Sequence, residues 1–371
     1  MVRALVRRWA RAAAVRYDAR TACRDASVKS TDSAHSEGTS PFAVAAELEL
    51  QGVSKWYPGQ DEPAVRGLSF TVPAGEVCVL VGPSGAGKTT AMRLINRMIA
   101  LSSGDILLGG RSVLEREPRE LRREIGYVIQ QVGLFPHQTV AQNIATVPRL
   151  LGWAKARIST RVHELLELVG LDRAMGGRYP SQLSGGQRQR VGVARALAAD
   201  PPLMLMDEPF GAIDPINRGR LQDEFLRLQE RVRTTVVFVT HDIDEAIKMG
   251  DRIAILREGG VLAQYDTPAS ILTRPADDFV AEFVGADRAL KRLSLSTVGE
   301  LNLTAPDELL GAVAEKRVSP QTSARDALSM LLSSNGEPLL VVDAEDNVEG
   351  AVTLETLEQL LSGETTESSA A

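Results

Sequence analysis

The chain of 371 residues contains 42 lysine and arginine residues against 48 aspartate and glutamate residues, which gives a formal net charge of −6. This balance argues against a protein that binds nucleic acid without sequence preference, because no domain-wide basic excess is available to the phosphates. No apolar run approaches the roughly 20 residues of a membrane-spanning helix, so contact with a membrane would have to pass through a partner.

Residues 1–45 differ in composition from the rest of the chain. Arginines interleave with alanines there, and a patch rich in serine and threonine follows. The arginines interrupt any apolar core, so a secretory signal is not predicted. A basic helix on an anionic membrane and a disordered basic extension both remain open. We favour the disordered extension, because an apolar helix face would offer few large residues besides Leu5, Trp9 and Tyr17.

Short apolar segments begin at residue 48. Residues 48–53 and 67–72 are predicted strands, and a third strand follows at residues 77–81. The glycine-rich residues 82–90 come next, and residues 91–97 are a good helix opening. Strand, glycine-rich loop and helix is the order that a phosphate-binding loop of the form G-x-x-x-x-G-K-[ST] requires.

The residue types in this loop fit the chemistry of phosphate binding. Glycines let the backbone adopt conformations that are closed to other residues, so successive N–H groups point at one spot. The N-terminus of the following helix adds its partial positive charge there. Lys88 supplies a full charge to the outer phosphates, and the Thr89 hydroxyl can bind Mg²⁺. The residues predicted to hold a nucleotide here are Gly82, Ser84, Gly85, Gly87, Lys88, Thr89 and Thr90.

Downstream of the loop, strand and helix patterns alternate. Apolar strands separated by amphipathic helices predict a parallel sheet covered on both faces, so the fold class is α/β. A helical insert separates the half that contains the loop from the second half. The predicted strands are residues 105–108, 126–129, 203–206 and 235–240, and the predicted helical segments are residues 140–171, 191–199, 215–231 and 242–249.

Two adjacent acids, Asp207 and Glu208, follow the apolar strand at residues 203–206. Opposite a phosphate-binding loop, the first acid has a natural role in holding Mg²⁺, usually through water. The second acid is then placed to orient and deprotonate a water that attacks the γ-phosphate, a role worth ~10²- to 10⁴-fold in rate. Either acid alone would more often be a solvated strand end. The pair therefore predicts nucleotide hydrolysis.

A second anion-binding segment lies between the two halves, at Ser184, Gly185, Gly186 and Gln187. Ser184 is a good N-cap residue, and the two glycines expose backbone N–H groups at a helix start. The glycine-rich loop alone provides one anion site for a triphosphate, so a second anion site in the same chain needs a separate explanation.

The motifs and their order resemble those of the ATP-binding-cassette (ABC) ATPases over residues 46–286. The resemblance implies a P-loop NTPase cassette with a parallel-sheet core, an antiparallel β subdomain and a helical subdomain. Residues 82–89 match the family's Walker A loop, residues 183–187 its signature and residues 203–208 its Walker B strand. The other matches are Tyr57 for the aromatic that stacks on adenine, with Trp56 as the alternative, Gln130 for the Q-loop, Asp214 for the D-loop and His241 for the switch histidine.

This resemblance implies a head-to-tail homodimer that sandwiches two ATP molecules, each between one subunit's loop and the other subunit's signature. That arrangement accounts for the second anion site. The catalytic residues it implies are Glu208, His241, Lys88 and Gln130, and the Mg²⁺ ligands are Thr89, Gln130 and Asp207. Tyr57, Ser184, Gly185, Gly186, Gln187 and Asp214 are expected to contact ATP together with the residues of the loop.

Several stretches resemble the importer branch of the family more narrowly, namely residues 125–137, 143–148, 238–246, 265–268 and 278–285. The likeness implies the osmoprotectant subfamily, which imports glycine betaine, carnitine or choline. It also implies a peripheral position at the cytoplasmic face of the cell membrane, against integral permease subunits that receive solute from an extracytoplasmic binding protein, with no nucleic-acid partner. Import of another small solute, and a soluble ABC ATPase that acts on DNA or ribosomes, are the alternatives.

The C-terminal region resembles a single repeat of a cystathionine-β-synthase (CBS) module. We expect a linker at residues 287–297, a CBS-like α/β module at residues 298–363 and a disordered tail at residues 364–371. Thr356 stands where the nucleotide-binding version of the module often has aspartate, so a dimerisation or regulatory role is preferred to an AMP sensor. An ionic-strength sensor is a further alternative, although basic residues are few here. The predicted order is helix 323–334, strand 338–342, strand 350–353 and helix 354–361.

Overall fold

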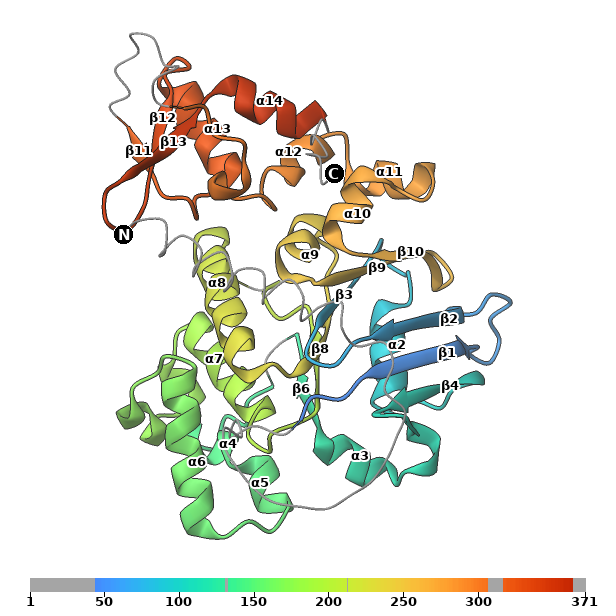
Figure 1. Cartoon of the computed structure of the whole chain (residues 1–371). Helices are drawn as coiled ribbons and strands as arrows, with labels where there is room; N and C mark the ends of the chain where they lie inside the picture. The colour runs from blue at the N-terminus through green and yellow to red at the C-terminus, as the bar shows by residue number, and fades with distance from the viewer. Residues whose placement is uncertain (1–43, 131–132, 212, 306–315, 363–371) are drawn as a thin grey trace, which may run out of the picture. The chain divides into compact units, whose positions relative to one another are not determined.

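The computed structural model describes residues 44–130, 133–211, 213–305 and 316–362 (Figure 1). Nearly all of the predicted extension at residues 1–45 and the whole predicted tail at residues 364–371 lie outside this part of the chain. In the part that is described, no helix combines the length and the apolar composition needed to cross a lipid bilayer.

A six-stranded sheet in the order β10-β9-β3-β8-β7-β6 forms the centre of the described structure. Neighbouring strands from β9 to β6 run parallel, and β10 pairs antiparallel with β9 at one edge. The parallel core predicted from the sequence is therefore confirmed, with an antiparallel edge strand added. The strands are β3 (Val77–Val81), β6 (Ile125–Val128), β7 (Leu203–Asp207), β8 (Thr235–Val239), β9 (Arg252–Arg257) and β10 (Val261–Asp266).

Successive residues of the central strands face two different hydrophobic cores. In β3, the side chains of Val77, Val79 and Val81 belong to one core, whereas Cys78 and Leu80 belong to the other. Side chains alternate between the two faces of a strand, so both faces of this sheet are covered. Cys78 is fully buried and burial raises the pKa of its thiol, as expected for a core residue.

An antiparallel sheet in the order β2-β1-β4-β5 shares one of these cores with α2, which follows the glycine-rich loop. It forms the antiparallel subdomain that the family resemblance implies. Its elements and the helices near it are β1 (Leu48–Lys55), β2 (Val65–Val72), β4 (Ser103–Leu108), β5 (Arg111–Ser112), α2 (Lys88–Ile95), the 3-10 helix Val113–Glu115 and α3 (Pro118–Glu124).

The helical insert consists of several short helices rather than one long helical region. The segment predicted at residues 140–171 divides into α4 (Val140–Ile144), α5 (Thr146–Leu150) and α6 (Lys155–Leu168). It breaks after α5 at Gly152, whose φ is +73°, a conformation that favours glycine. Two 3-10 helices, Arg173–Gly177 and Pro180–Gln182, lead from α6 to α7 (Gly185–Ala196).

The helix expected at residues 191–199 begins earlier than predicted, at Gly185. The Ser184 hydroxyl accepts a hydrogen bond from the Gln187 backbone N–H at 3.2 Å, and the Gln187 side chain accepts one from the Ser184 N–H at 2.9 Å. This capping box satisfies two N–H groups of the first turn, which offsets the low helix propensity of the two glycines.

The second half of the cassette and the C-terminal region complete the described chain. The C-terminal sheet has the order β11-β12-β13 and packs with its helices around a separate small core that includes Leu331 and Val341. The order of helix, strand, strand and helix there is as predicted. The remaining elements are α8 (Pro215–Val232), α9 (Ile243–Met249), α10 (Pro268–Thr273), α11 (Asp278–Val284), α12 (Arg288–Arg292), the 3-10 helix Val298–Glu300, β11 (Arg317–Val318), α13 (Ala324–Ser333), β12 (Leu339–Val342), β13 (Val348–Val352) and α14 (Leu354–Ser362).

Candidate nucleotide-binding and hydrolysis site

The glycine-rich loop joins the carboxyl end of β3 to the N-terminus of α2. Gly82 has a φ of +154° and Gly87 a φ of +78°. A Cβ atom at Gly82 would collide with the Leu256 carbonyl oxygen, and one at Gly87 with the Ala64 carbonyl oxygen. These two positions therefore need glycine both for backbone conformation and for the close approach of neighbouring backbone.

Lys88 is held inside the loop by its own backbone. Its Nζ donates hydrogen bonds to the carbonyl oxygens of Gly82 at 2.7 Å and Pro83 at 2.9 Å, and the residue is only 8% exposed. Burial lowers the pKa of the ammonium group, and the nearby carboxylates of Glu208 and Asp207 oppose that shift. The lysine is thus a fixed, poorly hydrated cation at the position where phosphates are predicted to bind.

A cavity of about 320 Å³ lies beside this loop. It is lined by residues 84–90 and by Ala64, Glu208 and His241. The structure therefore brings the Walker A-like loop, the second acid of the Walker B-like pair and the predicted switch histidine to one place.

Asp207 ends β7 and faces the first turn of α2. Its Oδ1 accepts a hydrogen bond from the Thr89 hydroxyl at 3.4 Å. Burial and the neighbouring Glu208 raise the pKa of the Asp207 carboxyl above its usual range. A hydroxyl and a carboxylate are oxygen ligands of the kind that Mg²⁺ prefers, so this pair fits a nucleotide-bound Mg²⁺. Gln130 was predicted as a third ligand, but its amide nitrogen contacts Glu208.

Glu208 adopts a strained backbone conformation, with a φ of +43°. Its Oε2 accepts a hydrogen bond from Gln130 Nε2 at 2.9 Å, and its Oε1 lies 3.3 Å from His241 Nδ1. Three predicted catalytic residues from separate segments of the chain therefore meet at one carboxylate. A non-glycine residue at positive φ costs energy that a purely structural strand end would not need. Nothing in the local sequence signals this conformation.

Tyr57 lies at a neighbouring cavity of about 680 Å³, which also includes Ser84 and Gly85 of the loop. Lys55 Nζ stands 5.2 Å from the centre of the Tyr57 ring. Trp56 is 43% exposed and does not line the cavity, so the structure favours Tyr57 as the aromatic at this site. Residues 60–64 and 258–259 also line the cavity and were missed in the sequence. The Pro58-Gly59 turn between β1 and β2 was the available signal.

The signature residues stand apart from the cavity beside the loop. Ser184 is the N-cap of α7, and Ser184 and Gly185 are exposed. Neither they nor Gly186 and Gln187 are among the described residues that line that cavity. The oxygen of the Gln187 side chain is already engaged by the capping box.

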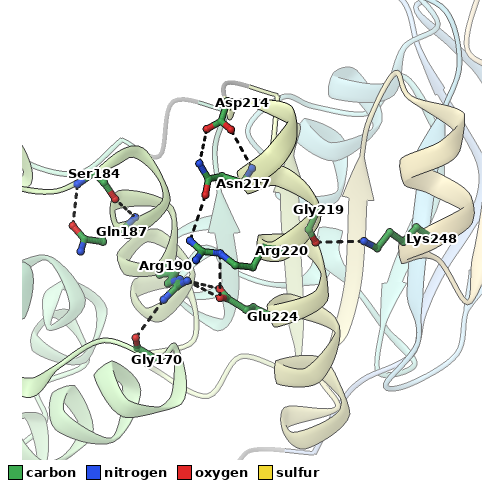
Figure 2. Close-up of polar contacts among 10 residues, drawn as sticks. All are labelled: Gly170, Ser184, Gln187, Arg190, Asp214, Asn217, Gly219, Arg220, Glu224 and Lys248. Carbon is green, nitrogen blue, oxygen red and sulfur yellow. Dashed lines mark hydrogen bonds and ion pairs between the residues drawn. The ribbon is translucent and has the colours of Figure 1, made fainter. Parts of the chain in front are cut away.

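Asp214, the predicted D-loop residue, is the N-cap of α8. It accepts hydrogen bonds from the Asn217 backbone N–H at 3.1 Å and from Asn217 Nδ2 at 2.9 Å. Figure 2 shows polar contacts that continue from Asn217 to Arg220, and from there to Glu224.

The same contacts join α8 to α7. Glu224 forms an ion pair with Arg190 of α7 at 2.6 Å, and Arg190 also donates to the Gly170 carbonyl oxygen at 3.3 Å (Figure 2). An ion pair therefore joins the helix that begins at the signature, about one and a half turns from its N-terminus, to the helix that follows Asp214, about two and a half turns from its N-terminus.

Comparisons with known proteins agree with these features. A family model described as "ABC transporter" matches residues 65–211. The chain is 52% identical over 263 residues to an osmoprotectant import ATP-binding protein of Salmonella typhimurium, which covers 70% of this chain and 69% of the relative. It is 47% identical over 313 residues to a glycine betaine/carnitine/choline transport ATP-binding protein of Bacillus subtilis, covering 84% and 80%.

A solved structure extends the comparison to three dimensions. It is the dimeric, post-hydrolysis state of an ATP-binding cassette bound to ADP and Pi. The TM-score is 0.53 at 32% sequence identity, and the match covers 60% of this chain and 98% of the other.

Proposed function

This chain belongs to the osmoprotectant importer family of ABC transporter ATP-binding proteins and is an ATP hydrolase, and we propose that the hydrolysis energises uptake of a quaternary-amine solute. Glycine betaine, choline and carnitine are the solutes we expect. The observation that carries the hydrolytic role is the meeting of Gln130, Glu208 and His241 beside the phosphate-binding loop. The choice of solute rests on the names of the relatives.

The loop is expected to bind the phosphates of ATP through its backbone N–H groups, the N-terminus of α2 and Lys88. Because Lys88 is buried beside the cavity, its charge acts on a phosphate with little screening by water. Mg²⁺ bound with the nucleotide would be held by Thr89 and Asp207, with Gln130 as the third predicted ligand, and would neutralise charge on the phosphates.

Glu208 is proposed to orient the attacking water and to accept its proton. Gln130 contacts one carboxylate oxygen of Glu208 and His241 the other, so both oxygens have a defined partner and the carboxylate plane is fixed. A base held in one orientation beside the loop that is proposed to bind the phosphates supports this role. The His241 side chain is largely exposed, and it is proposed to contact the γ-phosphate when ATP is bound.

The signature of α7 is proposed to complete the site of a second copy of the chain. Ser184 and Gly185 are exposed and do not line the described cavity beside the loop of their own chain. A homodimer in which each loop faces the partner's signature places both anion-binding segments on the same triphosphate.

We propose permease subunits in the membrane as the partners that receive the energy of hydrolysis. They would in turn receive solute from an extracytoplasmic binding protein, and this chain would lie at the cytoplasmic face of the membrane. Phe135, Leu150 and Leu151 follow the Q-loop segment and are each at least 40% exposed, which suits contact with an apolar partner surface.

The C-terminal region is proposed to be a CBS-like dimerisation or regulatory module at residues 298–363, joined to a cassette at residues 46–286. The intervening linker at residues 287–297 includes α12. Lys291 of α12 is 9% exposed and lies 3.2 Å from Asp244 of α9, the helix that follows His241. Arg292 donates to the Leu360 carbonyl oxygen of α14 at 3.2 Å. These contacts would link the module to the hydrolysis site.

Glu208→Gln tests the hydrolytic mechanism. The amide keeps the shape of the side chain but cannot accept the proton, so turnover should fall ~10²- to 10⁴-fold while ATP binding and ATP-dependent dimerisation persist. Phosphate release and ATP binding by the purified chain measure the two effects. Glu120→Gln, an exposed glutamate on α3 that lines neither cavity of the site, serves as the matched control. Normal turnover by E208Q would remove Glu208 from the role of base.

Uptake of labelled solute tests the transport role. Cells with and without this protein should differ in uptake of glycine betaine, choline or carnitine. A difference confined to methionine, nitrate or a sugar would replace the proposed solute with one of the alternatives.

A further inference from the structure

The carboxyl group of Glu245 is buried close to His241 and has no part in the mechanism proposed above. Glu245 belongs to the first turn of α9 and is only 8% exposed. Within the described part of the chain, it lines neither cavity of the nucleotide site. Burying a carboxyl group costs free energy that an apolar side chain of similar size would not cost. An acid at this position therefore indicates a specific role.

Two neutral donors hold this carboxyl group. Gln222 of α8 is 6% exposed, and its Nε2 donates a hydrogen bond to Glu245 Oε1 at 2.9 Å. Burial raises the pKa of the Glu245 carboxyl, and hydrogen bonds from the Thr240 hydroxyl and the Gln222 amide oppose that shift. Glu245 is therefore an acceptor shared between α8 and the residue that precedes His241.

Thr240 connects this carboxyl group to the backbone on both sides of His241. Thr240 is 2% exposed and directly follows β8, and its backbone N–H donates to the Leu80 carbonyl oxygen of β3 at 3.1 Å. Its hydroxyl oxygen accepts a hydrogen bond from the Asp242 backbone N–H at 3.1 Å. A hydroxyl that donates to Glu245 and accepts from Asp242 holds the turn at residues 240–242 in one conformation.

The other end of this turn is held by Asp242. Its Oδ1 accepts the backbone N–H groups of Asp244 at 2.9 Å and Glu245 at 3.2 Å, which starts α9. Within the turn, His241 Nδ1 lies 3.3 Å from Glu208 Oε1. A displacement of about 1 Å at a reacting group can cost ~10²-fold in rate, so the conformation of this turn bears on hydrolysis.

We propose that Glu245 is a positioning residue for His241. Through Thr240 and Gln222, it holds the turn at residues 240–242 against α8 and so keeps the imidazole beside the Glu208 carboxylate. This inference rests on the role in hydrolysis that is proposed for His241. Glu245 itself does not contact the reacting atoms.

Steady-state hydrolysis by the purified full-length chain tests the proposal. Glu245→Leu removes both acceptor oxygens at similar volume, so kcat should fall about tenfold while the KM for ATP changes less than about twofold. His241→Ala should lower kcat about a hundredfold. Because Glu245 acts through His241, the double variant E245L/H241A should be no slower than H241A. A further tenfold loss in the double variant would show a general structural effect and would overturn the proposal.

The single variants separate this proposal from the proposed function. A wild-type kcat in H241A would remove His241 from hydrolysis, and this inference with it. A wild-type kcat in E245L, together with an impaired H241A, would leave the hydrolytic mechanism intact and overturn the positioning role alone.

Exchanging the two polar side chains gives a second test, which does not remove both polar contacts at once. Glu245→Gln offers one acceptor oxygen to two donors, so kcat should fall about threefold to tenfold. In Q222E/E245Q, the carboxylate on α8 accepts from the amide on α9, whose oxygen remains for Thr240. The kcat of this double variant should return to within about twofold of the wild type. A kcat that stays at the level of E245Q would contradict the link to α8.

Asp223→Asn is the matched control for contact between the same two helices. Asp223 of α8 pairs with Lys248 of α9 at 2.7 Å, and Lys248 also donates to the Gly219 carbonyl oxygen at 3.3 Å (Figure 2). These exposed contacts do not include Thr240, so D223N should keep the wild-type kcat. A loss in D223N as large as that in E245L would trace the effect to the packing of α8 on α9 and would overturn the proposal.

Discussion

The two anion-binding regions of this chain are built in different ways. The Walker A-like region lies where β3, β7 and β8 end, and it holds a lysine that is 8% exposed, an acid at positive φ and hydrogen bonds that join distant segments. The signature region is the exposed first turn of one helix, and its capping box involves Ser184 and Gln187 alone.

This difference indicates that the loop half of the site is already formed within a single chain. The sheet fixes the loop half, because its residues are held by strands buried on both faces. The signature half is held through α7 and, by way of Arg190 and Glu224, through α8. We propose that the loop half carries the hydrolytic residues and that the signature half of each site is supplied by another copy of the chain.

Asp207→Asn acts on the loop half and should have the largest effect. Removing the carboxylate that faces Thr89 should lower Mg²⁺-dependent hydrolysis about a thousandfold, since a catalytic metal contributes several kcal/mol. Phosphate release at varied Mg²⁺ concentration measures it, and Asp278→Asn, an exposed aspartate on α11 that lines neither cavity of the site, is the control.

The same variant also makes a prediction about pH. The pKa of Asp207 is higher in the folded chain than in the unfolded chain. The folded chain therefore loses stability as pH rises from the ordinary carboxyl pKa through the raised pKa of Asp207. The melting temperature of D207N should therefore exceed that of the wild type by about 1–3 °C at neutral pH. Below pH about 4, the two melting temperatures should be equal. A lower melting temperature for D207N at neutral pH would contradict this reading of the site.

Ser184→Ala acts on the signature half. It removes a helix cap worth about 0.5–2 kcal/mol and a proposed phosphate contact, so hydrolysis should fall about a hundredfold. Thr139→Ala is a matched control, because Thr139 and Gln142 form the same capping box at α4. T139A should lose stability but keep most of its hydrolysis. Equal losses of hydrolysis in both variants would mean that Ser184 acts only as a cap.

Glu224→Gln breaks the link between α7 and α8 and should have the smallest effect. The ion pair with Arg190 is partly exposed, so its loss should cost no more than about 1 kcal/mol, or a few degrees in melting temperature. Glu167→Gln breaks the more exposed pair with Arg173 and should change nothing measurable. Thermal unfolding of both variants gives the comparison, and an effect of E167Q as large as that of E224Q would show that the link has no special role.

Local patterns in the sequence predicted the loop half well. The strand at residues 77–81 has the predicted bounds, because a continuous apolar run is enclosed by turn residues on both sides. The glycine-rich loop and the acid pair were also identified from their residue types, whereas Gln130 and His241 came from the resemblance to the ABC family. That Gln130 and His241 would contact the two oxygens of Glu208 follows from strand order, which no short segment of sequence contains.

What the sequence missed depends on contacts between distant segments or on competition between local preferences. Ser184 was recognised as an N-cap, but the helix was assigned only from residue 191, because glycines disfavour a helix, whereas the capping box starts α7 at Gly185. The positive φ of Glu208 has no signal in the neighbouring residues. The contact between Gln222 and Glu245 joins two helices, and no short segment of sequence contains both residues.

Mixing two inactive variants tests the central claim, that each site is shared between two copies of the chain. Lys88→Ala disables the loop half, and Gly185→Asp adds a negative charge at an open position of the signature half, where a helix N-terminus tolerates it. A heterodimer of the two contains one intact composite site, whereas each homodimer contains none. An equal mixture should recover up to about a quarter of the wild-type rate of phosphate release. Hydrolysis no greater than that of the two variants alone would contradict the shared site.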